Sequence, residues 1–418
     1  MSKLIWSPQQ EDALRECKRW LRNPTGPQVF YLAGYAGTGK TTLAKHLVES
    51  ESRGRWLFAA YTGKASYVLR QKGCPDATTI HSLIYRPAGE TRKSEILTIE
   101  MRILELNCTK AERELTEVEQ NKLKFLLSTL VDLTRDNKPK FSVWLYSPLG
   151  DHSVAGIVID EVSMVDQHLG KDLESFGKKI LVLGDPAQLP PVGAGGYYTK
   201  RKPNVMLTEV HRHARNSGIL RLATTIREGG SLDEFESCAD VEIITDKDED
   251  ALPSVVMGAN QVLVGMNVTR RAANRRYREL LGKTDPGPMT GDRLVCLRNE
   301  HDLGLFNGSQ WTVEKAEADL DSLTTWMQLR SEDDTSRTEV TSWMHHMLGK
   351  SDELGSMRFG RRDMSEFDWS YALTVHKAQG SQWNHVVLFD QSQSFRSNAR
   401  QWLYTGITRA AERLTVVL

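Results

Sequence analysis

Cysteine is scarce in this chain of 418 residues, and its five cysteines lie far apart: Cys17, Cys74, Cys108, Cys238 and Cys296. No two of them form the close pairs that zinc sites and redox motifs use, so the pattern predicts a reducing compartment and no zinc. Long hydrophobic runs are also missing, and the first six residues contain no signal-peptide core. We therefore expect a cytoplasmic protein without a membrane segment.

An excess of charge of one sign is absent as well, because 54 Lys and Arg balance 54 Asp and Glu. Without a global field, any attraction to nucleic acid must come from local basic patches. The densest patches lie at residues 200–202, 211–215 and 270–276, although a solvated surface is the alternative for each. The length predicts two to four compact units.

Residues 29–42 combine an apolar run, a glycine-rich loop and the start of a helix. The loop Gly34-Tyr35-Ala36-Gly37-Thr38-Gly39-Lys40-Thr41 has the spacing of a phosphate-binding P-loop, with a glycine-rich turn as the alternative. Its glycines let backbone N–H groups approach phosphates. Lys40 is expected to neutralise phosphate charge and Thr41 to ligate Mg²⁺. The nucleotide-binding residues predicted here are Gly37, Thr38, Gly39, Lys40, Thr41 and Thr42.

An acidic pair, Asp160 and Glu161, ends a second apolar run at residues 156–159. Beside a P-loop, the aspartate is expected to hold Mg²⁺ and the glutamate to orient and deprotonate an attacking water. Gln188 follows the apolar run 179–183 and is a candidate sensor of the γ-phosphate. Arg409 is a candidate arginine finger from a neighbouring unit. The alternatives are acids that cap helices and an arginine on the surface.

Weaker candidates come from other loops. Ser7 and Pro8 mark a helix start, and Gln10 beside them could reach an adenine edge, with an exposed helical glutamine as the alternative. Loops after parallel strands share one edge of a sheet, so Thr62, Lys64 and His81 are expected near the P-loop. Such side chains suit a phosphodiester backbone, although they could simply cap helices.

Other stretches predict insertions. Residues 86–140 contain two capping-box spacings and leucines at helical intervals, which predict a helical arm whose leucines pack on each other or on the main body. Residues 141–145 alternate like an exposed strand that returns the chain to the core, and residues 291–364 read as a small β insertion. Residues 193–196 are glycine-rich and predict a hinge.

Eight segments, in this order, resemble the superfamily 1 helicases, most closely the RecD-like and Dda-like branch: GYAGTGKT, YTGKA, TIHS, IDEVSM, GDPAQLPP, LTEVHR, LTVHKAQGS and LYTGITRA. The resemblance implies an α/β fold of two RecA-like parallel-sheet P-loop domains that sandwich ATP. The first would comprise residues 1–85 and 141–200, with the arm at 86–140. The second would comprise 201–290 and 365–418, with an SH3-like β insertion at 291–364.

The resemblance also implies roles. Gln10 would contact adenine, and Arg212 and Arg409 would enter the nucleotide cleft from the second domain. The residues in DNA-binding segments are Thr62, Lys64, His81, Thr374 and His376. A monomer would translocate 5′ to 3′ on single-stranded DNA and unwind duplex at junctions, with replication or recombination proteins as partners. The size of the chain suggests a phage or mobile-element enzyme, which would act in the host cytoplasm if it is phage-encoded.

One departure leaves alternatives open. The related enzymes carry a short β-hairpin pin where this chain has the 86–140 arm, so strand separation is less secure than ATP hydrolysis. The first alternative is a translocase that displaces proteins from DNA without unwinding it. The second is a DNA-binding switch that hydrolyses nucleotide slowly.

Overall fold

The computed structural model describes residues 6–51, 54–87, 141–143, 147–190, 196–209, 217–245, 252–300, 303–354 and 364–418, with a few isolated positions between 88 and 140. The chain divides into two compact units, residues 1–80 with 152–418 and residues 81–151. Most of the predicted arm and of the predicted glycine hinge lies outside the described residues, as does Arg212. No helix within the described ranges has the length and apolar character needed to cross a membrane.

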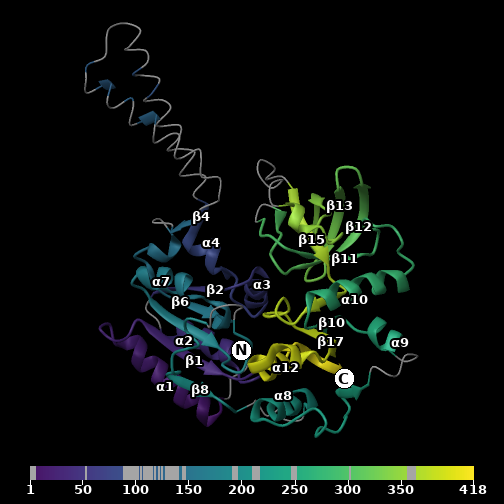
Figure 1. The fold of residues 1–418 in the computed structure, drawn as a ribbon. Helices are drawn as coiled ribbons and strands as arrows, with labels where there is room; N and C mark the ends of the chain where they lie inside the picture. Colours follow the sequence, from purple (N-terminus) through teal and green to yellow (C-terminus); the bar gives the residue numbers. More distant parts are fainter. Residues whose placement is uncertain are drawn as a thin grey trace. The chain divides into compact units, whose positions relative to one another are not determined.

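The larger unit contains a six-stranded sheet in the order β3-β2-β6-β7-β1-β8, of which Figure 1 labels β1, β2, β6 and β8. All of its pairings are parallel, and the residues of the central strands β1, β6 and β7 are almost all buried, as expected for a parallel sheet that is covered on both faces. The strands are β1 (Val29–Gly34), β2 (Arg55–Ala60), β3 (Thr78–Thr79), β6 (Val154–Asp160), β7 (Lys179–Gly184) and β8 (Val205–Leu207). The helices are α1 (Pro8–Arg22), α2 (Lys40–Glu51), α3 (Gly63–Gln71) and α7 (Gln167–Ser175), with the 3₁₀ turn η2 (Val162–Met164).

The same unit contains a second parallel sheet of five strands, in the order β16-β10-β17-β18-β9. Helices α8 and α12 contact each other, and their apolar residues join its core, with Trp402 fully buried. The strands are β9 (Val241–Ile244), β10 (Gln261–Val264), β16 (Ala372–Thr374), β17 (Trp383–Phe389) and β18 (Ala410–Val417). The helices are α8 (Gly218–Glu228), α9 (Leu252–Met257), α10 (Asn267–Leu280) and α12 (Ala399–Ile407), preceded by η6 (Ser392–Asn398).

A closed five-stranded barrel is inserted between β10 and β16 (Figure 1). It closes because β15 pairs with β14 on one side and with β11 on the other. Its interior holds Trp311, Met327, Leu329 and Phe367. The strands are β11 (Arg293–Cys296), β12 (Gln310–Asp319), β13 (Thr324–Ser331), β14 (Arg337–Trp343) and β15 (Met364–Trp369), with η5 (Ser351–Glu353). The predicted α/β fold with two parallel sheets and a small β insertion is therefore confirmed.

The smaller unit is built around an antiparallel pair, β4 (Tyr85–Pro87) with β5 (Phe141–Val143). Helix α4 (Ile80–Ile84) leads into it, and η1 (Pro148–Gly150) follows it. The predicted strand at residues 141–145 is present as β5 over residues 141–143, which pairs with β4 among the described residues, while residues 144 and 145 lie outside them. Alternating polarity indicates a half-exposed strand, but it does not identify the strand's partner.

The domain limits proposed from the sequence stay a prediction, but two strands extend beyond them. Strand β8 pairs with β1, so residues 205–207 extend the first sheet beyond residue 200. Strand β15 extends the barrel to Trp369, beyond residue 364, where the predicted β insertion ends. Short edge strands such as β8 carry too few residues for a recognisable alternation.

Candidate nucleotide and nucleic-acid site

The P-loop connects β1 to α2 and has the backbone that its glycines predict. Gly37 and Gly39 have φ values of 77° and 78°, in the left-handed region that favours glycine. The Lys40 ammonium donates to the carbonyl oxygens of Gly34 at 2.7 Å and Tyr35 at 3.0 Å. The lysine therefore lies along the inner side of the loop, where β- and γ-phosphates bind in P-loop proteins.

A pocket of about 420 Å³ opens beside this loop and is lined from both parallel sheets. It brings together nine predicted site residues: Gly37, Gly39, Lys40, Thr41, Thr42, Asp160, Glu161, Gln188 and Arg409. Thr38 is fully buried, and its hydroxyl donates to the Tyr35 carbonyl at 2.8 Å, so it supports the loop from behind. The pocket thus brings together predicted site residues that are up to 372 positions apart in the sequence, from Gly37 to Arg409.

Two residues with oxygen atoms that can ligate a hard metal ion, Thr41 and Asp160, lie next to each other in the pocket. The Thr41 hydroxyl donates to Asp160 Oδ2 at 2.8 Å, and Asp160 Oδ1 accepts from the Glu161 N–H at 2.9 Å. Hydroxyl and carboxylate oxygens are the ligands that Mg²⁺ takes beside a nucleotide. The donor set therefore fits a magnesium ion held by Thr41 and Asp160.

Glu161 has a backbone conformation unusual for a glutamate, with φ 53° and ψ 46°. Left-handed backbone at a residue other than glycine costs about 1–3 kcal/mol and is concentrated at functional sites. Burial raises the pKa of Glu161, Asp160 and Asp185 raise it further, and Arg409 and Lys40 oppose them. A carboxylate with a raised pKa beside a phosphate-binding loop is suited to accept a proton from water.

Arg409 is 5 % exposed and reaches the pocket from just beyond α12. Its guanidinium donates to the carbonyl oxygens of Thr405 and Ser381, both at 3.1 Å. Gln188 lines the same pocket, and its Oε1 atom is buried without a hydrogen-bond partner among the described residues. An unsatisfied buried oxygen at this place fits a polar ligand, such as a nucleotide with its water.

Gln10 lies behind the P-loop and outside the pocket lining. Its side-chain amide donates to the Thr38 carbonyl at 3.0 Å, and its oxygen accepts from the Ser7 N–H in a capping box that starts α1. At 3 % exposed, it is not the exposed helical glutamine of the alternative. Contact with adenine stays a prediction.

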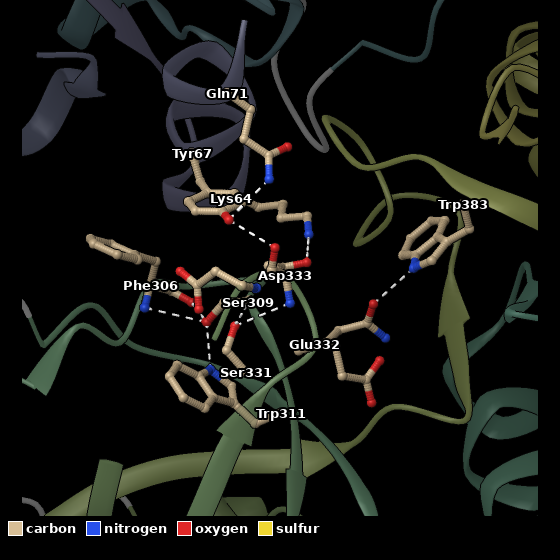
Figure 2. Close-up of polar contacts among 12 residues, drawn as sticks. Lys64, Tyr67, Gln71, Phe306, Ser309, Trp311, Ser331, Glu332, Asp333 and Trp383 are labelled. Atoms are coloured by element: carbon tan, nitrogen blue, oxygen red, sulfur yellow. Dashed lines mark hydrogen bonds and ion pairs between the residues drawn. The ribbon is translucent and has the colours of Figure 1, made fainter. Parts of the chain in front are cut away.

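Lys64, a predicted DNA-binding residue, forms an ion pair with Asp333 of the barrel (Figure 2). Both side chains are largely buried, and the neighbouring Tyr67 hydroxyl donates to the Asp333 carbonyl at 2.8 Å. Phe306 of the barrel packs so closely on Gly63 that a side chain there would overlap its Cβ. Helix α3 of the first sheet therefore contacts the β13–β14 turn of the barrel.

The other predicted DNA-binding residues are divided between the two units. Thr62 is the N-cap of α3, as the capping alternative predicted, because its hydroxyl accepts from the Ala65 N–H at 3.1 Å. Thr374 ends β16, and His376 follows it and packs near Phe395, where burial lowers the pKa of the imidazole. His81 is exposed on α4 and belongs to the smaller unit.

Two residues near the pocket were missed by the sequence analysis, Tyr404 and Asp185. The Tyr404 hydroxyl donates to Asp185 Oδ2 at 2.7 Å and accepts from the Ala36 N–H at 3.1 Å. Both residues lie inside segments that were recognised, GDPAQLPP and LYTGITRA. The position of Tyr404 five residues before Arg409 was the available signal, but nothing in the sequence indicated its partners.

Two family models match this chain. The AAA domain model matches residues 6–249, which is more than half of the chain. The UvrD-like helicase C-terminal domain model matches residues 370–417. The first match contains the P-loop, Asp160, Glu161 and Gln188, and the second contains Arg409.

Curated relatives match over most of the same region. The ATP-dependent RecD2 DNA helicase of Deinococcus radiodurans is 28% identical over 283 residues, which cover 62% of this chain and 35% of that protein. The RecBCD enzyme subunit RecD of Mycobacterium tuberculosis is 26% identical over 291 residues, covering 62% of this chain and 49% of that protein. The chain therefore spans half or less of the length of these relatives.

Solved structures of Pif1 helicases have the same fold. Pif1 helicases studied for DNA unwinding at forked duplex align over 99% of this chain and 92% of theirs, with a TM-score of 0.55 and 16% identity. The Bacteroides Pif1 helicase in complex with ADP-AlF3 and single-stranded DNA aligns over the same shares, with a TM-score of 0.55 and 14% identity. Because the AAA domain model matches more than half of its length, the chain belongs to the AAA domain family, and it is similar to RecD2 and RecD helicases in sequence and to Pif1 helicases in fold.

Proposed function

We propose that this chain is an ATP-dependent DNA helicase that translocates 5′ to 3′ on single-stranded DNA and unwinds duplex. One observation carries the proposal: the pocket that holds the P-loop, Asp160 and Glu161 of the first sheet also holds Arg409 from the second. A nucleotide between two sheets can change the distance between them as it binds and is hydrolysed. This is the property that a motor needs.

The residues of the pocket have roles that follow from their chemistry. Lys40 and Arg409 stabilise the negative charge that develops on the transferred phosphoryl group. Glu161 accepts a proton from the attacking water, whose oxygen bonds to the γ-phosphorus as the bond to the bridging oxygen breaks. Gln188 orients that water or the γ-phosphate. Thr41 and Asp160 would hold Mg²⁺, which supplies further charge neutralisation when bound.

Nucleic acid is proposed to bind along the loops that carry Lys64, Thr374 and His376. A structure of a similar protein supports the proposal that this chain binds DNA, since the Bacteroides Pif1 structure contains single-stranded DNA. Contacts to phosphates would be largely independent of sequence and would weaken with salt. A monomeric state, the replication or recombination partners and the cytoplasmic location stay predictions.

Strand separation with purified protein tests the proposal. The experiment compares partial duplexes with a 5′ tail and with a 3′ tail, each with and without ATP. We expect ATP-dependent release from the 5′-tailed duplex alone. Lys40→Ala is the control and should abolish hydrolysis while single-stranded DNA still binds, because it removes only the phosphate contact.

Each other outcome would support a different function or contradict one part of the proposal. Displacement of a DNA-bound protein without strand release would support the translocase that only remodels. Hydrolysis that single-stranded DNA does not increase would support the slow switch. Release from the 3′-tailed duplex alone would contradict the proposed direction, and hydrolysis retained by Lys40→Ala would contradict the nucleotide site.

A further inference from the structure

The hydroxyl of Tyr404 joins three elements at the edge of the nucleotide pocket. It donates to Asp185 Oδ2, which follows β7, and accepts from the Ala36 N–H of the P-loop. Tyr404 itself lies on α12 of the second sheet and is 1 % exposed. A hydrogen bond to a buried carboxylate is stronger than one between neutral groups, so this contact holds α12 firmly against the first sheet.

A second anchor follows directly. The Thr405 hydroxyl accepts from the Leu189 N–H at 2.9 Å, and the Gln379 amide donates to the Leu189 carbonyl at 3.0 Å. The Thr405 carbonyl oxygen also accepts a hydrogen bond from the Arg409 guanidinium at 3.1 Å. The same short stretch of α12 is therefore bonded to the segment that follows β7 on one side and to Arg409 on the other.

The P-loop is contacted from the second sheet at two adjacent residues. Besides the Tyr404 contact to Ala36, the Arg227 guanidinium of α8 lies 3.7 Å from the centre of the Tyr35 ring. Burial and the Asp185 carboxylate raise the pKa of Tyr404, so the hydroxyl keeps its proton and continues to donate. A change in the backbone of residues 35 and 36 would therefore directly alter the contacts that α8 and α12 make with the P-loop.

We propose that Tyr404 is a positioning residue that ties the backbone of the P-loop to the helix preceding Arg409, so that a change in the loop repositions the arginine. Tyr404 does not line the nucleotide pocket and acts through Arg409. The inference rests on the proposed ATP hydrolysis and names a residue that conveys the state of the P-loop to the second sheet.

The test uses Tyr404→Phe, which keeps the buried ring and removes only the hydroxyl. Tyr371→Phe is the matched control, because the Tyr371 hydroxyl also donates to a buried carboxylate, Asp292, at 2.7 Å and is 2 % exposed, but lies away from the pocket. We expect kcat for DNA-stimulated hydrolysis to fall about tenfold in Tyr404→Phe, the loss of one hydrogen bond to a charged group. The KM for ATP should stay within about twofold, since no nucleotide contact is removed.

A background lacking the arginine separates positioning from general stability. In Arg409→Ala, adding Tyr404→Phe should cause no further loss of kcat, because the tyrosine acts through the missing group. A tenfold further loss there would overturn the inference, as would an equal loss of kcat in Tyr371→Phe or an unchanged kcat in Tyr404→Phe. If the unaltered protein hydrolysed no ATP, the proposed function itself would fail.

Discussion

At the scale of single residues, the pocket depends on groups held in costly states. Glu161 combines a left-handed backbone with a carboxylate in a poorly solvated place. Neither feature stabilises the fold, since the burial of a carboxylate and an unusual φ both cost free energy. Both features fit the role proposed for Glu161, because a general base must have a suitable proton affinity and must point at the water that it deprotonates.

Catalysis should therefore depend on pH through Glu161. Burial raises its pKa above the ordinary 4.5, and the active form is the carboxylate, so kcat should fall as the pH drops through a value above 4.5. The measurement is kcat for DNA-stimulated hydrolysis against pH. Replacing Arg409 with glutamine removes an opposing positive charge and should move this acid limb to higher pH. An acid limb at or below 4.5 would contradict the assignment of Glu161 as base.

Gly380 permits a close approach between the two sheets. It has φ 77°, and a Cβ atom there would lie 3.1 Å from the Ala65 Cβ. Gly380→Ala should lower the free energy of unfolding by about 1–2 kcal/mol for the backbone alone, with a further cost from the contact. Gly282→Ala is the matched control, since Gly282 has φ 70° with nothing within 4 Å. Urea unfolding measures both, and equal losses would show that the contact has no cost.

At the scale of elements, α3 and the β13–β14 turn are joined by an ion pair with little solvent around it (Figure 2). Burial raises the pKa of Asp333, and Lys64 opposes the shift. Buried ion pairs often stabilise a fold less than apolar packing would, because both charges lose their hydration. We therefore expect that Lys64 can exchange Asp333 for another anion.

If Lys64 binds a DNA phosphate, Asp333 competes with it. Asp333→Asn removes the competing charge with little change in shape and should increase the affinity for single-stranded DNA about threefold or more. Fluorescence anisotropy at fixed salt measures the change. Asp321→Asn is the control, because it removes the same charge from an exposed turn elsewhere on the barrel. Equal affinities in the two variants would mean that Lys64 is not a DNA contact.

At the scale of the whole molecule, the larger unit is organised around a pocket between two parallel sheets, with a barrel inserted into the second. The balanced net charge means that this unit has no general attraction for DNA. Binding must come from a small number of local contacts. The proposed DNA contacts Lys64, Thr374 and His376 lie on or beside segments that line the nucleotide pocket, so DNA and ATP are expected to influence each other.

We expect single-stranded DNA to increase ATP hydrolysis at least tenfold, with the increase lost as salt rises from about 50 to 200 mM. The measurement is steady-state hydrolysis with a saturating oligonucleotide across a salt series. Hydrolysis without DNA should change little over the same range, because the pocket contacts are local. Stimulation that persisted unchanged at high salt would argue against phosphate contacts.

The sequence by itself determined the parts of the molecule that depend on local chemistry. The apolar runs at β1, β2, β6, β7 and β17 are long enough to show that they are buried strands. The P-loop glycines, Lys40, Thr41 and the Asp160–Glu161 pair were recognisable because phosphate binding demands fixed residue types at fixed spacing. Their meeting in one pocket followed from the rule that parallel strands present their loops at one edge.

Only the tertiary structure decided which distant residues touch. The partner of Lys64 is 269 positions away, and Tyr404 reaches Ala36 across 368 positions. The barrel closure and the separate pairing of β5 also depend on where other elements lie. Such contacts leave no periodicity or motif in the sequence, because each joins residues that are far apart along the chain and that another fold could have placed elsewhere.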